Sequence, residues 1–445
     1  MSRKITLIGG GSATFTPQLM RLFAGSEILR GSTIVLMDVD AYRLQVMDTL
    51  AKLIVSRAGA DLKVESTTDQ HEALVGADFV ITSIAVGGPD AYEPDIEIPA
   101  RYGIYMHVCD SVGPGGIMRA LRHIPVLVSV CQDLDKVSPH AVVVNYANPL
   151  SVNTLAMQRF ASVQTLGLCT CSTIPTRADY IAGVTGLNAD DLIVPATAAG
   201  INHCAAITEL RFKDGRDALP MARERATEPV TKWGLATFGV IPYCWSHWTE
   251  FFPSLSRLEE EYKGRLQGLK MQYNMHVFDM EDPNCPGARA RAARWAKLAE
   301  ELAQGKDTEG ITLDTLPQDE GVQVLQIMES LIENRNEVHI VNVANQGAIG
   351  NLPADAIVEV PAVIGAYGIK PVHVGNLPDP LAAILRTWIS VQDLIVEAAL
   401  NGDRKTALRA FQQDPQVAAK LTPQETERLL DEMLRVHASY LPRFN

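Results

Sequence analysis

A cysteine and a histidine that follow two separate apolar segments have the most distinctive chemistry in this chain. Cys169 ends the short run TLGLCT, and His203 lies in GINHC, which interrupts an extended segment from Thr197 to Leu210. A thiolate and an imidazole at two strand ends can converge on one metal ion. Lone cysteine and histidine residues are also common in cores and on surfaces, so their spacing alone leaves both interpretations open.

The N-terminal residues KITLIGGGSAT have the composition of a phosphate-binding turn. A buried strand is predicted at Ile5–Ile8, then come Gly9, Gly11 and Ser12, and a helix is predicted at Pro17–Phe23. Glycines let the backbone approach a pyrophosphate, and the helix N-terminus presents free N–H groups and a positive dipole. The third glycine of the usual pattern is absent. The alternative is a glycine turn that binds no cofactor.

An acidic residue ends the next predicted strand, Thr33–Met37. This residue, Asp38, lies 27 positions after Gly11, whereas about 20 is usual for the dinucleotide fingerprint. A carboxylate at this place accepts hydrogen bonds from a ribose 2′-OH and repels a 2′-phosphate. The pattern therefore favours NAD over NADP.

Polar residues also gather around the glycine-rich segment DSVGPGGIMR. Asp110 precedes a predicted loop at Val112–Gly116, and Arg119 lies early in the helix that follows. Asn148 comes after the strand predicted at Ala141–Tyr146 and before a proline-led helix. Such loops and strand ends face ligands in α/β sheets. Solvated charges at a helix entry and ordinary Asn-Pro turn chemistry are the alternatives.

These candidates depend on an α/β framework. Strands alternate with helices up to about residue 210, which predicts a parallel sheet with right-handed crossovers. Helices are more frequent after residue 212, including predicted helices at 220–231, 289–302, 322–334 and 379–400. Further strands are predicted at 338–345 and 357–363. We therefore expect a Rossmann-like, doubly wound NAD-binding domain at 1–195 and an α+β domain at 196–445 that caps the cleft and binds substrate and metal.

Composition narrows the class of protein. The chain has 445 residues, of which 47% are hydrophobic and 20% charged, as in an ordinary globular protein. Its net charge of −13 argues against a nucleic-acid partner. No apolar run approaches the roughly 18 residues of a membrane span, and no signal segment precedes the first strand. The seven cysteines are odd in number and lie mostly in apolar strands, so we expect reduced thiols and a cytoplasmic location.

Taken in order, these segments make the chain resemble glycoside hydrolase family 4 over nearly its whole length. The resemblance is carried by IGGGS, LMDVD, GADFVITS, DSVGPGGIMRALRHIP, NYANPLSV, the Cys169 strand end, GINH, VNVANQGAIGNLP and AIVEVPA. The GPGGI and NQG…NLP segments are most similar to the α-galacturonidase branch. The resemblance implies a fold like that of lactate and malate dehydrogenases, and a homodimer or homotetramer.

The family resemblance also implies NAD and a divalent metal, usually Mn²⁺. The metal of the family is held by a cysteine and by the histidine of an Asn-His pair, here Cys169 and His203. Asn148 and Asn202 match residues that contact the sugar near the metal, and Arg119 is a further substrate-binding candidate. Asp110 is our candidate for the acid or for a contact to a sugar hydroxyl.

In this family, hydrolysis proceeds by oxidation, elimination, addition and reduction rather than by two carboxylates. NAD⁺ takes a hydride from sugar C3, a base removes the acidified C2 proton, the glycosidic oxygen leaves, water adds and the hydride returns. The segment GVIPYCWSHWTEFFP matches the stretch that supplies this base, a Tyr or Asp, in relatives. Here it offers Tyr243, His247 and Glu250. Tyr243 is of the family type, and His247 has the most suitable ordinary pKa, about 6.5.

The residue after the metal cysteine follows substrate type in the family and is His, Asn or Asp, whereas this chain has Thr170. We predict hydrolysis of an α-glycoside such as an α-galacturonide, with a neutral or 6-phosphorylated hexoside as the alternative. Two further hypotheses are a malate-type dehydrogenase that releases NADH and a non-catalytic protein that senses NAD.

Overall fold

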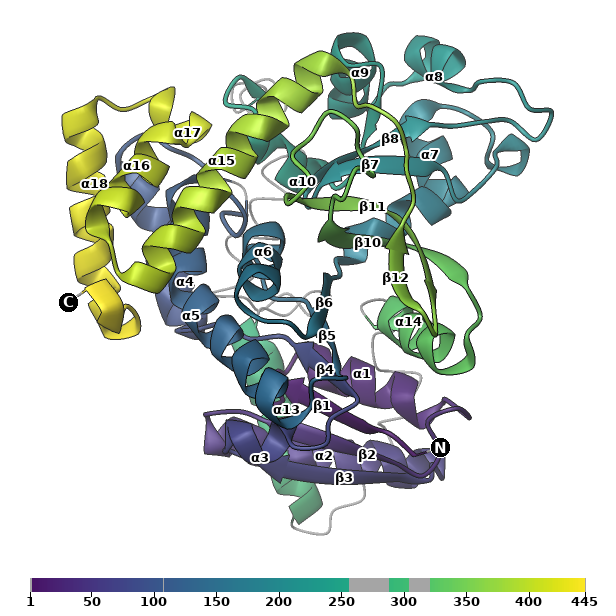
Figure 1. The fold of residues 1–445 in the computed structure, drawn as a ribbon, viewed down its shortest axis with the longest axis vertical. Coiled ribbons are helices and arrows are strands. Elements are labelled where there is room, and N and C mark those ends of the chain that lie inside the picture. The colour runs from purple at the N-terminus through teal and green to yellow at the C-terminus, as the bar shows by residue number, and fades with distance from the viewer. Residues whose placement is uncertain (1, 107, 256–287, 304–320, 445) are drawn as a thin grey trace.

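One mixed sheet runs through the molecule (Figure 1). The computed structural model describes residues 2–106, 108–255, 288–303 and 321–444. Its 12 strands follow the order β3-β2-β1-β4-β5-β6-β10-β11-β7-β8-β9, with β12 beside β11. The strands of the first half are β1 (Lys4–Ile8), β2 (Ser32–Met37), β3 (Leu62–Thr67), β4 (Phe79–Thr82), β5 (Val142–Asn145) and β6 (Gln164–Gly167).

The first half confirms the predicted doubly wound architecture. Its six strands pair in parallel in the order 3-2-1-4-5-6 of the dinucleotide-binding fold. β4 and β5 are buried along their whole lengths, as expected for parallel strands covered on both faces. The helices of this half are α1 (Phe15–Ala24), α2 (Ala41–Ala58), α3 (Gln70–Leu74), α4 (Gly88–Arg101), α5 (Gly113–Val137), α6 (Leu150–Phe160) and α7 (Ala178–Thr185).

The second half is α+β, as expected, but its strands extend the same sheet. These strands pair antiparallel with one another, and β10 pairs antiparallel with β6, the last strand of the first half. The strands are β7 (Thr197–Ile201), β8 (Cys204–Glu209), β9 (Ile241–Pro242), β10 (Glu337–Ala344), β11 (Ile357–Gly365) and β12 (Gly368–Pro371). The helices are α8 (Leu219–Arg225), α9 (Pro229–Thr237), α10 (Trp245–Trp248), α13 (Ala288–Ala303), α14 (Val322–Glu333), α15 (Asp379–Asn401), α16 (Arg404–Gln413), α17 (Pro415–Ala418) and α18 (Pro423–Val436). α15 crosses α5 and α6 and ties the halves together (Figure 1).

Two local predictions were wrong. The expected loop at Val112–Gly116 is largely the first turn of α5, which begins at Gly113. Its glycines serve close packing, because a Cβ on Gly115 would lie 2.3 Å from the sulfur of Cys109. The single helix expected at 220–231 is two helices, because the Pro229 ring starts α9 and the Glu228 side chain caps it. The helices α4 and α16–α18 were not predicted.

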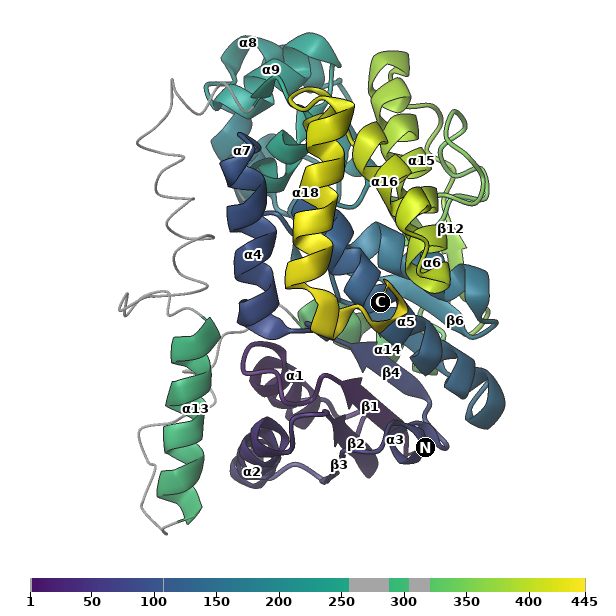
Figure 2. The same cartoon turned by 90° about the vertical axis from the view of Figure 1, so that its left-hand side faces the viewer.

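A buried ion cluster fixes α5, on which part of the candidate site depends. Arg122 on α5 pairs with Asp95 on α4 at 2.6 Å, and Nε2 of His437 lies 2.9 Å from the same carboxylate. Figure 2 shows α4 and α18 side by side over this region. Among the described helices, none is both long and apolar enough to cross a membrane.

Candidate active site

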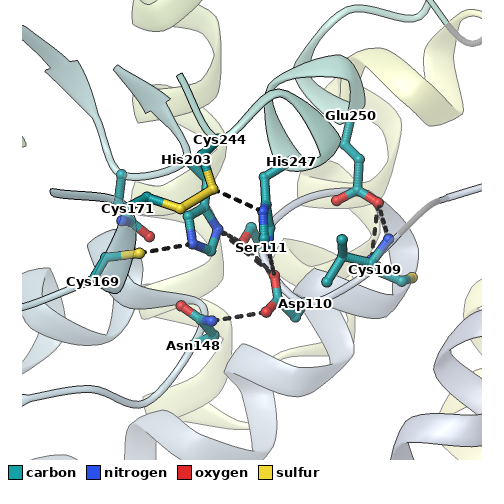
Figure 3. A network of polar contacts seen from close by, with 12 residues as sticks. Cys109, Asp110, Ser111, Asn148, Cys169, Cys171, His203, Cys244, His247 and Glu250 are labelled. Atoms are coloured by element: carbon teal, nitrogen blue, oxygen red, sulfur yellow. Dashed lines mark hydrogen bonds and ion pairs between the residues drawn. A yellow bond between two sulfur atoms is a disulfide. The ribbon is translucent and has the colours of Figure 1, made fainter. Parts of the chain in front are cut away.

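A thiol and an imidazole nitrogen meet where β6 ends and β7 turns into β8. Sγ of Cys169 lies 3.3 Å from Nε2 of His203, so the structure brings the predicted pair together (Figure 3). Burial, with a smaller contribution from neighbouring His247, lowers the pKa of His203 to about 3. The ring is therefore neutral at physiological pH, which is the form that binds a metal. Burial raises the pKa of the Cys169 thiol.

Ser111 fixes the other ring nitrogen of His203. Its Oγ lies 2.6 Å from Nδ1 of His203 and donates a 2.6 Å hydrogen bond to Oδ1 of Asp110. Because the serine proton is committed to the carboxylate, this network assigns the imidazole proton to Nδ1. The lone pair of Nε2 then faces Cys169. Histidines that bind metals are usually held in this way through their second nitrogen.

The sheet places the strands that precede the two candidate ligands, Cys169 and His203, with two strands between them. β6 pairs with β10 at Gly167 and Asn342, β10 with β11 at Asn342 and Glu359, and β11 with β7 at Glu359 and Gly200. His203 follows in the turn after β7 with a φ of 65°. A non-glycine residue in this left-handed region costs about 1–3 kcal/mol, and such residues cluster at functional sites.

Asn148 is anchored on both its side chain and its backbone. Its Nδ2 donates to Oδ2 of Asp110 at 2.8 Å, and its carbonyl oxygen accepts from Nε of Arg119 at 3.1 Å. The same carbonyl oxygen lies 2.8 Å from Nδ1 of His123, whose Nε2 accepts from the backbone N–H of Val86 at 3.0 Å. These contacts connect the end of β4, beside the glycine loop, with the Cys169–His203 pair.

His247 and Asp110 lie on the Nδ1 side of His203. The two imidazole centroids are 3.8 Å apart, and Nε2 of His247 lies 3.8 Å from Oδ1 of Asp110. Burial lowers the pKa of His247, and Asp110 partly offsets this effect. Burial pushes the pKa of Asp110 upward, but His247, His203 and Arg119 outweigh it and the net shift is downward. An ionised Asp110 suits a hydrogen-bond acceptor better than a general acid.

Tyr243 and Asn202 lie on the Cys169 side of the site and share a buried carboxylate. The Tyr243 hydroxyl donates to Oε1 of Glu359 at 2.6 Å, and Nδ2 of Asn202 donates to Oε2 at 3.1 Å. The third base candidate, Glu250, is engaged elsewhere, since its Oε1 accepts from the backbone N–H of Cys109 at 3.0 Å. Glu250 thus supports the backbone just before Asp110 (Figure 3).

The expectation that all cysteines are reduced is wrong for two of them. A disulfide joins Cys171 to Cys244, residues 73 positions apart that only the fold brings together. It links the segment after Cys169 to the segment of Tyr243 and His247 (Figure 3). Among the described residues, His203, Cys244 and His247 have donor atoms within 4.8 Å of one another. Because a disulfide sulfur is no thiolate, Cys244 cannot supply a thiolate ligand to that group.

Mass spectrometry of the alkylated protein can test whether Cys171 and Cys244 form a disulfide. Alkylation of the unfolded protein without reductant should leave Cys171 and Cys244 unlabelled, and prior reduction should label both. Cys131, which is a free buried thiol, is the internal control and should be labelled in either case. Equal labelling of Cys244 before and after reduction would contradict the disulfide.

The glycine loop is closed onto β2. The N–H groups of Gly9 and Gly10 donate to the carbonyl oxygen of Met37 at 2.9 and 2.8 Å, and that of Gly11 donates to Oδ2 of Asp38 at 2.9 Å. Asp38 therefore shapes the loop, in addition to the ribose contact expected of it. Oγ of Ser12 accepts from the N–H of Phe15, the first residue of α1, at 3.1 Å.

Sequence reasoning missed Ser111 and Glu359. No spacing pattern marks Ser111, because its contact to His203 joins residues 92 positions apart in the sequence. Glu359 could have been found, because it is the one charged residue in the run AIVEVPAVIG. A carboxylate in an apolar strand must meet donors inside the protein.

Known proteins are similar to this chain over nearly its whole length. The model of the family 4 glycosyl hydrolases matches residues 4–178, and the model of the C-terminal domain of the same family matches residues 198–417. An α-galactosidase of Bacillus subtilis (strain 168) is 31% identical over 99% of this chain and 100% of its own length. An α-galacturonidase of Lachnoclostridium phytofermentans is 29% identical over 99% of this chain and 97% of its own.

A solved structure shows the same fold. The 6-phospho-α-glucosidase from gut microorganisms, in complex with NAD and Mn²⁺, superposes with a TM-score of 0.73 at 23% identity. The alignment covers 100% of both chains.

Proposed function

This chain belongs to the family 4 glycosyl hydrolases, and on that premise we propose that it hydrolyses an α-glycoside with the help of NAD⁺ and a divalent metal. The observation that carries the proposal is the convergence of Sγ of Cys169 and Nε2 of His203 at 3.3 Å. Mn²⁺ is a harder ion than these two donors, but two protein ligands leave its other positions open for the hard oxygens of a sugar. Ser111 supports this fit by orienting the imidazole.

The glycine loop fits the proposed NAD. A Cβ on Gly11 would lie 2.8 Å from Oδ2 of Asp38, so a larger residue would push away the carboxylate that closes the loop. The loop precedes α1, whose N-terminus supplies N–H groups for a pyrophosphate. We propose Gly9, Gly11, Ser12 and Asp38 as the cofactor-binding residues.

When bound, NAD⁺ withdraws and returns a hydride at sugar C3, and the metal acts as a Lewis acid toward the sugar oxygens. We propose that Tyr243 removes the C2 proton from the Cys169 side of the site. His247, neutral and facing the Asp110 carboxylate, moves the proton of the leaving group and of the incoming water on the other side. Asn148, Asn202 and Arg119 hold the sugar hydroxyls or its C6 substituent.

We propose an α-galacturonide as the substrate, with a neutral α-galactoside as the second candidate. Arg119, whose guanidinium lies 5.2 Å over the ring of Tyr92, supplies a cation beside Asn148 for a C6 carboxylate. The similarity to the α-galactosidase over the whole chain favours the second candidate. The test is a panel of nitrophenyl glycosides of both sugars and of the 6-phosphate of the neutral sugar, with NAD⁺, Mn²⁺ and a thiol reductant. Release of NADH without nitrophenol on every substrate would favour a dehydrogenase instead.

Replacing Gly11 with alanine tests the cofactor loop. The new Cβ would displace the Asp38 carboxylate, at an overpacking cost of about 1–3 kcal/mol, so NAD⁺ affinity should fall by about 10- to 100-fold. Isothermal titration measures this affinity directly. Gly183→Ala is the matched control, since nothing lies within 4 Å of its Cβ position. Equal affinities of the two variants for NAD⁺ would exclude this loop as the cofactor site.

The pH dependence of metal binding follows from the two ligands. Burial raises the pKa of Cys169, so the metal must displace the thiol proton, whereas His203, with its pKa lowered to about 3, is already unprotonated. The affinity for Mn²⁺ should therefore rise about tenfold per pH unit between about pH 6 and pH 8. A slope near two, read from titrations at several pH values, would show that a second ligand also loses a proton.

We also propose domain boundaries, an oligomeric state and a cellular location. We propose domains at 1–195 and 196–445, in keeping with the gap between the two family models at 178 and 198. We propose a homodimer or homotetramer, which light scattering would test. We place the enzyme in the cytoplasm, where NAD is available. The Cys171–Cys244 disulfide would then be one of the exceptions among proteins of that compartment.

A further inference from the structure

Glu359 is a fully buried carboxylate on β11, which lies between β6 and β7, the strands that precede the two proposed metal ligands. It accepts hydrogen bonds from three side chains: the Tyr243 hydroxyl at 2.6 Å, and Nδ2 of Asn202 and of Asn342 at 3.1 and 2.9 Å. Both amides donate to Oε2, and among the described residues Tyr243 is the donor to Oε1. The three donors satisfy a charge that burial would otherwise make costly.

Tyr243 can act as a base only if it gives up its own proton, and Glu359 is placed to accept that proton. Tyr243 is 2% exposed, and burial together with the neighbouring Glu359 raises the pKa of Tyr243 well above its usual value. A phenol that carries its proton at neutral pH can accept another only if the first proton leaves at the same time. The short hydrogen bond points that proton at Oε1 of Glu359.

We propose that Glu359 is the positioning residue of the C2 deprotonation, which orients Tyr243 and receives the phenolic proton as Tyr243 takes the proton of the sugar. This inference rests on the proposed function, because it presupposes a C3 ketone formed with NAD⁺. The C2–H bond breaks and leaves its electron pair on the sugar, an O–H bond forms on Tyr243, and its former proton passes to Oε1. Both protons return by the same path when C2 is protonated again.

Glu359 also aligns the base with the sugar contacts. Through Oε2 it holds Asn202, the neighbour of His203, and through Oε1 it holds Tyr243, which directly follows β9. Its own backbone lies opposite Gly200 of β7 and Asn342 of β10 in the sheet. The proton acceptor and a substrate contact are thus fixed to one rigid group.

The Glu359→Gln variant separates proton transfer from support of the fold. A glutamine of equal shape can keep its oxygen toward Asn202 and Asn342, but it then presents an NH₂ group to Tyr243. The phenolic oxygen becomes an acceptor, and its proton has no base to reach. We expect kcat to fall by about 100-fold, with KM and the affinities for NAD⁺ and Mn²⁺ within about twofold of wild type.

A double-mutant cycle with Tyr243→Phe distinguishes a role of Glu359 through Tyr243 from a purely structural role. If Glu359 acts through Tyr243, Glu359→Gln should lower kcat in the wild-type background and have no further effect in the Tyr243→Phe background. A purely structural role would instead lower kcat in both backgrounds. The primary isotope effect from deuterium at C2 should rise in Glu359→Gln, since proton abstraction becomes slower.

The control is Glu209→Gln, which changes an exposed glutamate of β8 outside these contacts and should leave kcat unchanged. If wild type hydrolyses a glycoside and Glu359→Gln matches its kcat, the inference fails and the proposed function stands. Additive losses in the cycle would also overturn the inference. If wild type neither hydrolyses any glycoside of the panel nor exchanges its C2 proton, the proposed function fails and the inference with it.

Discussion

Replacing Cys169 with serine should lower the affinity for Mn²⁺ by about 100-fold or more and reduce hydrolysis to a similar extent. Loss of a group that only supports a ligand already costs about 10- to 100-fold, and serine removes a ligand itself. The hydroxyl of serine does not ionise at neutral pH and is a poor replacement for a thiolate. Isothermal titration with Mn²⁺, with NAD⁺ present, measures the change.

Cys131→Ser is the matched control for this experiment. Cys131 is a free buried cysteine on α5, away from His203, so its variant should bind Mn²⁺ as wild type does. The NAD⁺ affinity of Cys169→Ser should also stay unchanged, since the glycine loop lies in a different part of the sheet. Wild-type Mn²⁺ affinity in Cys169→Ser would remove Cys169 from the metal site.

Tyr243→Phe should lower kcat by about 10²- to 10⁴-fold, the usual contribution of a general base. KM should change little, because the ring remains and the sugar contacts are made by Asn148, Asn202 and Arg119. The variant leaves Oε1 of Glu359 without its 2.6 Å donor, which should cost about 1–3 kcal/mol of folding free energy. Steady-state kinetics and thermal unfolding measure the two effects.

The matching control for this variant is Tyr367→Phe, in which the side chain is 84% exposed. It should change neither kcat nor stability. If Tyr243→Phe keeps the kcat of wild type, the base lies elsewhere and His247 becomes the leading candidate. His247→Gln would then be expected to abolish exchange of the C2 proton.

The sequence predicted the fold of the first half well, because that half depends on local patterns. Apolar runs such as Ile5–Ile8 are too short for a helix, and amphipathic segments such as Tyr42–Ala58 are too long for a strand. It did not predict that the later strands join the same sheet. That depends on β10 pairing with β6 at Asn342 and Gly167, residues 175 positions apart in the sequence, and no local pattern records such a contact.

From the residue types alone, a metal site at Cys169 and His203 was one of two interpretations. The family resemblance then indicated that these two residues bind one metal ion. The structure then showed which hydrogen-bond partner each side-chain atom faces, which neither the residue types nor the resemblance could show. The proton on Nδ1 of His203 follows from Ser111, and the Asp110 carboxylate is held by hydrogen bonds from Ser111 and Asn148. Both depend on side chains that approach from different elements.

The central claim is that a redox cofactor serves a hydrolysis in which the C2 proton is removed and replaced. The most direct test is to hydrolyse the best glycoside of the panel in D₂O with a catalytic amount of NAD⁺ and to examine the sugar product by NMR. We expect deuterium at C2 of the product, and we expect that NADH does not accumulate as the product forms. A product that keeps its original hydrogen at C2, or one NADH formed for each sugar released, would contradict the account.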